Sequence, residues 1–244
     1  MSSDGRGAGA VGPLALVGSG EFTPAMEAVD RELLEGRPGR VVFLPTAAAP
    51  EGEERLGYWV DLGMSHYARL GVEAVPLMVR RREDAENPEL ATQVAGAGLV
   101  YMSGGDPAFL ADTLRDTAVG AAIQGAWEGG AAVAGCSAGA MAMTEFAPRM
   151  RNRIDPPVPG LGLVRGVMVL PHFDRMEQWL PGATDVALAA APPGYWVLGI
   201  DEETAVVGGP QDWRVAGRQS AWLMRAGEER REFHAGDRLS TERP

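Results

Sequence analysis

The stretch that most constrains this fold is residues 131–142, which read Ala-Ala-Val-Ala-Gly-Cys-Ser-Ala-Gly-Ala-Met-Ala. A short apolar run ends at Gly135, a Gly-x-Ser-x-Gly segment follows, and small residues then continue in a pattern typical of a helix. A strand that turns sharply into a helix needs residues without bulk around the turn, and Gly135 and Gly139 meet that need. The pattern predicts that Ser137 lies at the tip of a nucleophile elbow with its hydroxyl exposed.

The helix predicted after Ser137 directs free backbone N–H groups and its positive dipole end toward the serine. An oxyanion formed by attack on a carbonyl carbon would be stabilised there. The chain has 33 glycines, so a Gly-rich turn that serves only packing is the alternative. The strand–turn–helix context favours the elbow.

Short apolar runs alternate with helical patterns along the first 143 residues. Strands are predicted at residues 13–17, 40–45, 73–79, 99–102 and 131–134, with helical segments between them. This alternation predicts an α/β protein with a mostly parallel sheet and helices on both faces. Sites in such sheets lie beyond the carboxyl ends of the strands. The loops at residues 18–22, 103–107 and 135–139 fall there, so we expect them to form one site.

The pattern changes after residue 143. Residues 144–162 are irregular and rich in Pro, Gly and Arg, and a strand at 167–170 runs into Pro-His-Phe-Asp. Short strands are predicted at residues 197–200, 204–207, 213–216 and 221–225. We expect these four to form a small antiparallel ribbon beside the sheet. The predicted organisation is a disordered lead at residues 1–12, a single α/β domain of the hydrolase type at 13–225, and a C-terminal strand or tail at 226–244.

Composition excludes several classes of function. The net charge of −11 disfavours nucleic acid and anionic membranes as partners, and no apolar run is long enough to span a bilayer. Cys136 is the only cysteine, which excludes an internal disulfide, fits a reducing cytoplasm and leaves little for a metal site, so we expect neither metal nor cofactor. The chain contains no lysine, which excludes Schiff-base and Ser-Lys chemistry.

A serine nucleophile needs a base within hydrogen-bond reach. His172 follows an apolar strand and comes after Ser137, the order found in elbow hydrolases, so it is the predicted base. The alternative is a histidine that only caps a turn or packs in the core. His66 lies in a polar helical region and His234 lies among charges, so we expect both on the surface.

The sequence leaves open which carboxylate would orient the base. Asp155 lies in the loop before His172, Asp174 follows the histidine by two residues, and Glu202 and Glu203 follow the strand at 197–200. A carboxylate in that place sets the tautomer of the imidazole and stabilises the imidazolium. The alternative for each is a solvated loop charge.

Two glycines upstream suit the second half of an oxyanion hole. Gly104 and Gly105 would let the backbone approach a ligand closely. The N–H of Gly105, together with that of Ala138, would then face the oxyanion. A plain turn at the strand end is the alternative.

Five segments carry a resemblance to one family: VGSGEF at residues 17–22, SGGD at 103–106, GCSAGA at 135–140, PHF at 171–173 and GIDEETA at 199–205. In this order they resemble the dipeptidase E and cyanophycinase family of serine peptidases, from about residue 13 to 223. The resemblance implies a class I glutamine amidotransferase-like fold, a three-layer sandwich, with Ser137 as nucleophile and His172 as base.

The resemblance favours Asp155 as the acid, since aspartyl dipeptidases carry it in an Asp-x-Pro segment, and leaves Asp174 as the alternative, the position used in the amidotransferase relatives. Cyanophycinases have Gln before the histidine and an arginine-rich stretch after it, whereas here Pro171 precedes the histidine and only Arg175 follows closely. Cleavage of cyanophycin is therefore disfavoured. Asp106 and Arg175 are the candidate substrate contacts.

The resulting hypothesis is a cytoplasmic serine hydrolase, monomer or homodimer, that cleaves small peptides such as aspartyl dipeptides through an acyl-enzyme. The rival is a non-catalytic amidotransferase-like protein that binds a small ligand, and a His172 out of reach of Ser137 would favour it. A glutaminase subunit is disfavoured because the elbow carries Ser137, with Cys136 one position too early.

Overall fold

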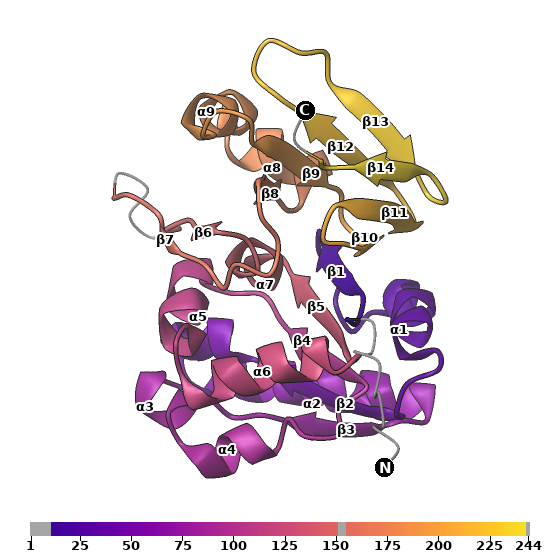
Figure 1. Cartoon of the computed structure of the whole chain (residues 1–244), viewed down its shortest axis with the longest axis vertical. Helices are drawn as coiled ribbons and strands as arrows, with labels where there is room; N and C mark the ends of the chain where they lie inside the picture. Colours follow the sequence, from indigo (N-terminus) through magenta and orange to yellow (C-terminus); the bar gives the residue numbers. More distant parts are fainter. Residues whose placement is uncertain (1–10, 151–154, 243–244) are drawn as a thin grey trace, which may run out of the picture.

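The computed structural model describes residues 11–150 and 155–242 and builds most of its strands into two sheets. The larger has eight strands in the order β14-β11-β10-β1-β5-β4-β2-β3, and the smaller has four in the order β13-β12-β9-β8. The parallel strands and their helices occupy the lower part of Figure 1, and the C-terminal strands occupy the upper part. Of the disordered lead predicted at residues 1–12, residues 1–10 lie outside the described part of the chain.

The centre of the larger sheet is parallel. Its five parallel strands are β1 (Leu14–Val17), β2 (Arg40–Leu44), β3 (Glu73–Pro76), β4 (Leu99–Met102) and β5 (Ala132–Cys136). Every residue of β1, β4 and β5 is buried, as expected for strands that are covered on both faces.

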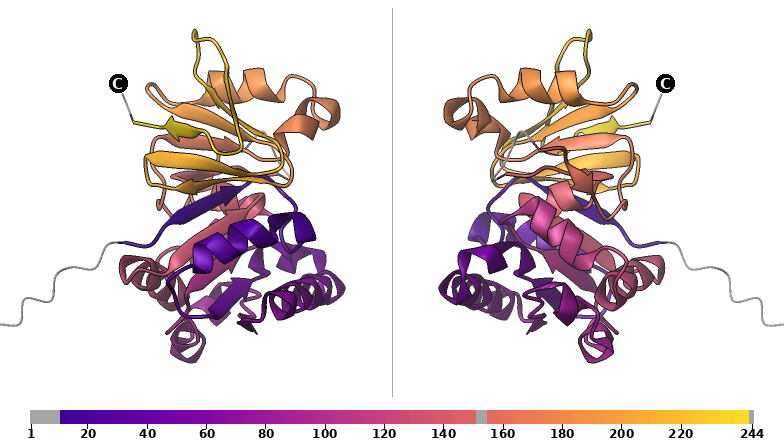
Figure 2. Two further views of the ribbon diagram at one scale, coloured as in Figure 1. Left: turned by 90° about the vertical axis from the view of Figure 1, so that its right-hand side faces the viewer. Right: turned by 90° about the vertical axis from the view of Figure 1, so that its left-hand side faces the viewer.

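Helices cover both faces of this parallel region. One apolar cluster joins α1 (Glu27–Leu34) and α2 (Glu53–Leu70) to one face. A second joins α5 (Pro107–Leu114), α6 (Ala118–Glu128) and α7 (Ala138–Ala142) to the other face. The predicted α/β class with a mostly parallel sheet is confirmed, and Figure 2 shows the helices on either side. The remaining helical segments are η1 (Pro24–Met26), η2 (Thr46–Glu51), α3 (Arg82–Ala85), α4 (Pro88–Thr92), α8 (Phe173–Trp179) and α9 (Ala183–Ala190).

The C-terminal strands do not form the separate ribbon that the sequence predicted. The chain alternates between the two sheets instead. The larger sheet is extended by the antiparallel strands β10 (Thr204–Gly208), β11 (Asp212–Gly217) and β14 (Arg238–Ser240). The smaller sheet consists of β8 (Val167–Leu170), β9 (Trp196–Ile200), β12 (Ser220–Met224) and β13 (Arg231–His234), and a short pair, β6 (Phe146–Ala147) and β7 (Val158–Pro159), lies apart.

Residues 226–244, predicted as a C-terminal strand or tail, contribute strands to both sheets, β13 and β14. The physical reason is burial. Trp213 of β11 pairs with Leu239 of β14, both side chains are buried, and the Trp213 indole donates to the Thr241 hydroxyl at 3.1 Å. A strand that covers a tryptophan in this way is part of the core and not an appendage.

His66, expected on the surface, is fully buried on α2. Its Nε2 lies 2.7 Å from Oδ2 of the buried Asp30 on α1, and its Nδ1 lies 3.3 Å from a guanidinium nitrogen of Arg69. Because a guanidinium only donates, Nδ1 accepts and Nε2–H donates to Asp30. Burial raises the pKa of Asp30, and the hydrogen bond from His66 opposes that rise. This contact ties α1 to α2 beneath the sheet.

Within the described residues, none of the helices has both the length and the apolar character that crossing a membrane requires.

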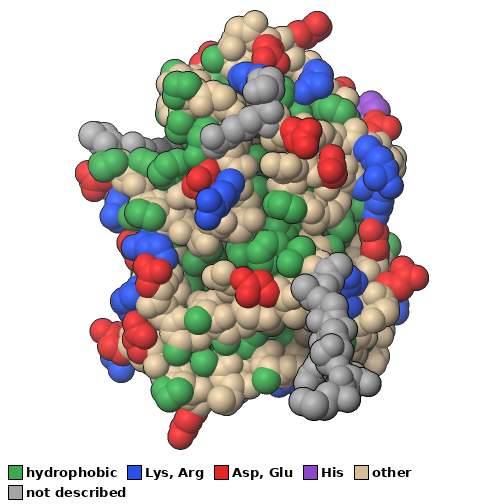
Figure 3. All heavy atoms as spheres, viewed as in Figure 1, with side chains coloured by type: hydrophobic (Ala, Val, Ile, Leu, Met, Phe, Trp, Pro, Cys, Tyr) green, Lys and Arg blue, Asp and Glu red, His purple; other side chains and the backbone are tan. Residues whose placement is uncertain are grey.

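Charges are mixed on the face shown in Figure 3. Acidic and basic side chains are dispersed there among apolar ones, without a continuous basic patch.

Replacement of Asp30 by alanine is expected to destabilise the fold by about 1–3 kcal/mol, because the buried N–H of His66 loses its acceptor. Urea-induced unfolding at pH 7 measures the change in the free energy of unfolding. Asp61 is an exposed carboxylate on α2, and its replacement by alanine is the matched control, expected to stay within about 0.5 kcal/mol. Equal stabilities for the two variants would contradict the role given to Asp30.

Candidate active site

The strand, turn and helix around Ser137 lie where the sequence placed them. β5 ends at Cys136, and α7 begins directly after Ser137. Ser137 has φ +50° and ψ −106°, a strained backbone conformation that non-glycine residues rarely adopt. Its N–H donates to the carbonyl of Val17 on the neighbouring strand β1 at 2.9 Å. The strain is thus held by the centre of the sheet.

The two glycines of the motif are required by close backbone contacts. A Cβ on Gly135 would lie 2.4 Å from the carbonyl carbon of Gly139, and a Cβ on Gly139 would lie 2.2 Å from the carbonyl oxygen of Met102. Both distances are far below van der Waals contact, so only glycine lets the helix start this close to the strands.

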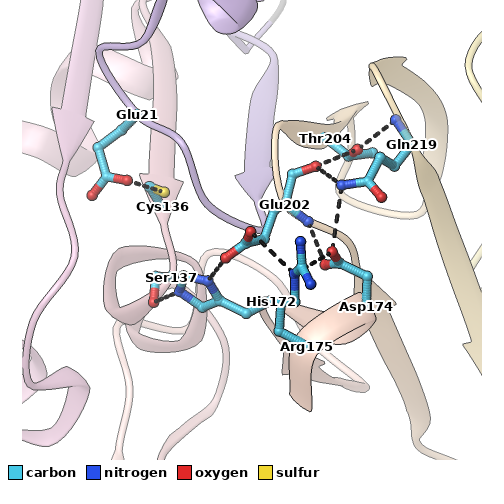
Figure 4. Close-up of polar contacts among 9 residues, drawn as sticks. All are labelled: Glu21, Cys136, Ser137, His172, Asp174, Arg175, Glu202, Thr204 and Gln219. Carbon is cyan, nitrogen blue, oxygen red and sulfur yellow. Dashed lines mark hydrogen bonds and ion pairs between the residues drawn. The ribbon is translucent and has the colours of Figure 1, made fainter. Parts of the chain in front are cut away.

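His172 follows β8 and occupies a left-handed conformation with φ +51° and ψ +39°. Its N–H donates to the carbonyl of Gly18 at 3.3 Å, in the loop after β1. The imidazole Nε2 lies 3.1 Å from the Ser137 hydroxyl oxygen. Figure 4 shows the two side chains pointing toward one another. The structure therefore brings the predicted nucleophile and base together.

The carboxylate against the imidazole is Glu202. Its Oε1 lies 2.9 Å from His172 Nδ1 (Figure 4). A carboxylate at this distance keeps the proton on Nδ1, which leaves the Nε2 lone pair facing the serine hydroxyl. Ser137, His172 and Glu202 thus form a continuous relay of hydrogen bonds.

Neither Asp155, the preferred acid, nor the alternative Asp174 takes this position against the imidazole. Asp155 is exposed in the loop before β7. Asp174 accepts a hydrogen bond from the backbone N–H of Glu202 at 2.8 Å. Asp174 therefore supports Glu202, and Glu202 contacts the histidine. Glu202 was one of four carboxylates that the sequence left open. The reason it reaches the histidine is that β8 and β9 are parallel neighbours, so the loops after them leave the sheet at the same edge.

The Gly104–Gly105 loop lies beside the elbow. A Cβ on Gly104 would be 3.6 Å from the Ser137 Cβ, and Gly105 is exposed with φ +140°. The Gly104 N–H is taken by Glu21 at 2.8 Å. Within residues 11–150 and 155–242, the N–H groups of Gly105 and Ala138 have no acceptor. These two predicted donors remain available to a ligand.

The two predicted substrate contacts differ in their surroundings. Asp106 caps α5 by accepting the N–H of Phe109 at 3.0 Å. Arg175 is half exposed, and its Nε lies 3.4 Å from Asp174 and 3.8 Å from Glu202. Arg175 is therefore a counter-charge for the two carboxylates behind His172, and part of its side chain faces solvent.

Trp179 is a neighbour of the site that the sequence analysis missed. It ends α8, its side chain is 62% exposed, and its ring centroid lies 5.3 Å from that of His172. A tryptophan in the first helix after a predicted catalytic histidine would have been the only sequence signal. No group of three or more His, Cys, Asp or Glu side chains that could hold a metal occurs in the described part of the chain.

Cys136, next to the nucleophile, is buried as a free thiol. Burial raises the pKa of the Cys136 thiol well above its usual value, and the Glu21 carboxyl beside it raises it further. We expect iodoacetamide at pH 8 to leave native Cys136 unmodified, because the reactive thiolate is absent. Mass spectrometry would check this, with urea-unfolded protein as the alkylated control. Rapid alkylation of the folded protein would contradict the assigned environment.

Comparisons with known proteins point to one family. The pattern of peptidase family S51 matches residues 14–214. The cyanophycinase of Trichormus variabilis is 29% identical over 170 residues, which are 65% of this chain and 55% of that protein. The cyanophycinase of Synechococcus elongatus is 31% identical over 167 residues, 64% of this chain and 50% of that protein. The chain thus spans about half the length of these curated relatives.

Solved structures give a similar result. The crystal structure of a peptidase from an acI-B1 Actinobacterium is 38% identical with a TM-score of 0.87, over 94% of this chain and 97% of that one. A putative peptidase E protein from Listeria monocytogenes EGD-e has a TM-score of 0.61 at 19% identity over 93% and 100% of the chains, which is a likeness of fold alone. The resemblance to dipeptidase E and cyanophycinase is confirmed, and the chain belongs to peptidase family S51.

Proposed function

We propose that this chain is a serine peptidase that works through Ser137, His172 and Glu202. The observation that carries the proposal is the relay of two hydrogen bonds, 3.1 Å from Ser137 to His172 and 2.9 Å from His172 to Glu202. The rival hypothesis of a non-catalytic binding protein expected His172 out of reach of the serine, and this distance disfavours it.

In the proposed reaction, His172 Nε2 takes the hydroxyl proton as Ser137 Oγ attacks the carbonyl carbon of the scissile bond. The N–H groups of Gly105 and Ala138 stabilise the resulting oxyanion. His172 then gives the proton to the leaving amine, and the C–N bond breaks to leave an acyl-enzyme. Water, deprotonated by His172, hydrolyses this ester and restores the serine. Glu202 holds the imidazole in place and stabilises its charged form.

Glu202 is itself supported by its neighbours. The N–H of Glu202 donates to Asp174, and the Arg175 guanidinium lies between the two carboxylates. Arg175 reduces the mutual repulsion of these carboxylates while Glu202 stays against the imidazole. The cluster holds the Glu202 carboxylate in the position that the proposed mechanism needs.

The substrate we propose is a small peptide. The leaving amine must lie near His172, which protonates it, and Trp179 and the solvent-facing part of Arg175 flank that histidine. These groups suit an apolar side chain and a free carboxylate on the leaving residue. The relatives named cyanophycinase make their polymer a further test substrate, although Pro171 departs from that pattern. Aspartyl dipeptides, a cytoplasmic location, and a monomer or homodimer remain predictions.

Labelling with a fluorophosphonate, which reacts with activated serines, tests the proposal. We expect the wild type to label and the Ser137→Ala and His172→Ala variants to lose the label. Glu202→Gln is expected to lower kcat for a cleaved dipeptide by roughly 10²–10⁴-fold, because the amide does not hold the required tautomer. A folded wild type that does not label would contradict the peptidase assignment.

Two other carboxylates provide matched controls for Glu202. Glu203 is adjacent in sequence but pairs with Arg218 at 2.8 Å, and Asp155 is exposed in its loop. We expect Glu203→Gln and Asp155→Asn to keep kcat within about threefold, the range of an ordinary surface substitution. A large loss in Asp155→Asn with none in Glu202→Gln would restore the original prediction.

Trp179→Ala tests the leaving-group side of the site. We expect it to raise KM by about tenfold for dipeptides with a large apolar leaving residue, and much less for those with glycine, because only the former bury their side chain on the indole. Val186, on α9 and 69% exposed, is the control, and Val186→Ala should change neither value. Equal effects on both dipeptide classes would argue against an apolar subsite at Trp179.

A further inference from the structure

Glu21, in the loop after β1, is a buried carboxyl that the proposed reaction does not use. It is 6% exposed, and both of its oxygens accept hydrogen bonds. Oε1 accepts the backbone N–H of Gly104 at 2.8 Å, and Oε2 accepts the thiol of Cys136 at 2.8 Å, the contact drawn in Figure 4. One donor lies after β4 and the other ends β5. A single side chain thus joins three neighbouring strand ends.

Stability alone does not account for a carboxyl in this position. In the part of the chain that the structure describes, Glu21 forms no ion pair with an arginine or histidine. Burial of a carboxyl without a counter-charge is costly, and an apolar side chain of the same size is often at least as stable. The contribution of Glu21 is therefore its two hydrogen bonds, and its role depends on the segments that these bonds hold in place.

The first of these bonds holds the loop that carries the proposed oxyanion donor. The Gly104 position lies between Glu21 and the nucleophile, since a Cβ there would be 3.0 Å from Glu21 Oε1 and 3.6 Å from the Ser137 Cβ. Orienting the Gly104 N–H toward Glu21 sets the plane of that peptide group. The Gly105 N–H belongs to the next peptide group, which is separated from this one only by the two backbone dihedrals of Gly104.

Glu21 can act as a rigid support because its own backbone is anchored. Phe22, the next residue, has φ +64° and is buried. Its ring packs against five aromatic rings with centroid distances of 5.3 to 6.3 Å, those of Phe43, Trp59, His66, Tyr67 and Tyr101. The loop that presents the carboxyl is therefore attached to the apolar core.

We propose that Glu21 is a positioning residue that holds the Gly104–Gly105 loop against the elbow and so preorganises the Gly105 N–H for the oxyanion. The inference rests on the proposed peptidase function and names a further part of the same site. Glu21 acts through Gly104 and does not touch the substrate. Donors held in place before the reaction are worth more than donors that must be ordered during it.

Two variants of similar size separate the hydrogen bond from the volume of the side chain. Glu21→Met removes both acceptors, whereas Glu21→Gln keeps an oxygen for the Gly104 N–H. We expect Glu21→Met to lower kcat by roughly 10²–10³-fold, the loss typical of an oxyanion donor, with KM nearly unchanged. Glu21→Gln should restore most of kcat. Hydrogen exchange of the Gly104 amide should be faster than in wild type only in Glu21→Met.

The controls separate this effect from general destabilisation. Thr117→Ala removes the side-chain N-cap of α6, which has no part in the elbow or in the Glu21 contacts, and should lower thermal stability while keeping kcat. If Glu21→Met does not fold, Glu21→Asp replaces it as the test. Glu21→Asp keeps the carboxyl but is too short to reach the Gly104 N–H, so we expect it to fold and to lose kcat.

Two results would overturn the role of Glu21: a folded Glu21→Met with wild-type kcat, or a Glu21→Gln as impaired as Glu21→Met. Failure of the proposed function is distinguishable, because it appears in the wild type as an absence of labelling and turnover, and it would overturn this inference as well. If the wild type is active and the Glu21 variants keep wild-type kcat, the peptidase proposal stands and the positioning role does not.

Discussion

The backbone of residues 17–19, the last residue of β1 and the two that follow it, holds the parts of the site in register. Its three successive carbonyls accept from three segments that are far apart in the sequence. The pairs are Val17 O with Ser137 N at 2.9 Å, Gly18 O with His172 N at 3.3 Å, and Ser19 O with Glu203 N at 3.1 Å. A Cβ on Gly18 would lie 2.1 Å from the Asp201 carbonyl oxygen, so only glycine permits this approach. The relay therefore depends on backbone contacts at the end of the central strand.

The two sheets supply different parts of the relay. The elbow belongs to the larger sheet, whereas His172 and Glu202 follow the parallel neighbours β8 and β9 of the smaller one. Their relative placement is set by a shared apolar cluster. That cluster contains Leu16 and Val206 from the larger sheet together with Leu198 and Leu223 from the smaller one. The distance from serine to histidine is thus a property of the packed core, and a repacking at this junction would change it.

Local sequence patterns predicted the parts of this structure that local forces determine. Unbroken apolar runs gave the parallel strands, and the need for glycine at positions 135 and 139 gave the elbow. Glu202 could not be selected from four carboxylates, because its position depends on the pairing of β8 with β9. His66 was misplaced for the same reason, since its partner Asp30 lies 36 residues away on another helix. Both of these positions therefore depend on contacts between segments that are distant in the sequence.

The same distinction explains why a buried carboxyl at position 21 escapes a reading of the sequence. Glu21 follows Gly-Ser-Gly, and a segment of this composition is typical of an exposed loop. Its donors are a backbone N–H and a thiol, which carry no charge pattern that would indicate a partner. In water these hydrogen bonds would contribute little to stability. In the interior, a donor or an acceptor that is left without a partner destabilises the fold. Burial makes the contact specific, and it holds the glycine pair between the hydrogen bonds that Ser103 and Asp106 form on either side.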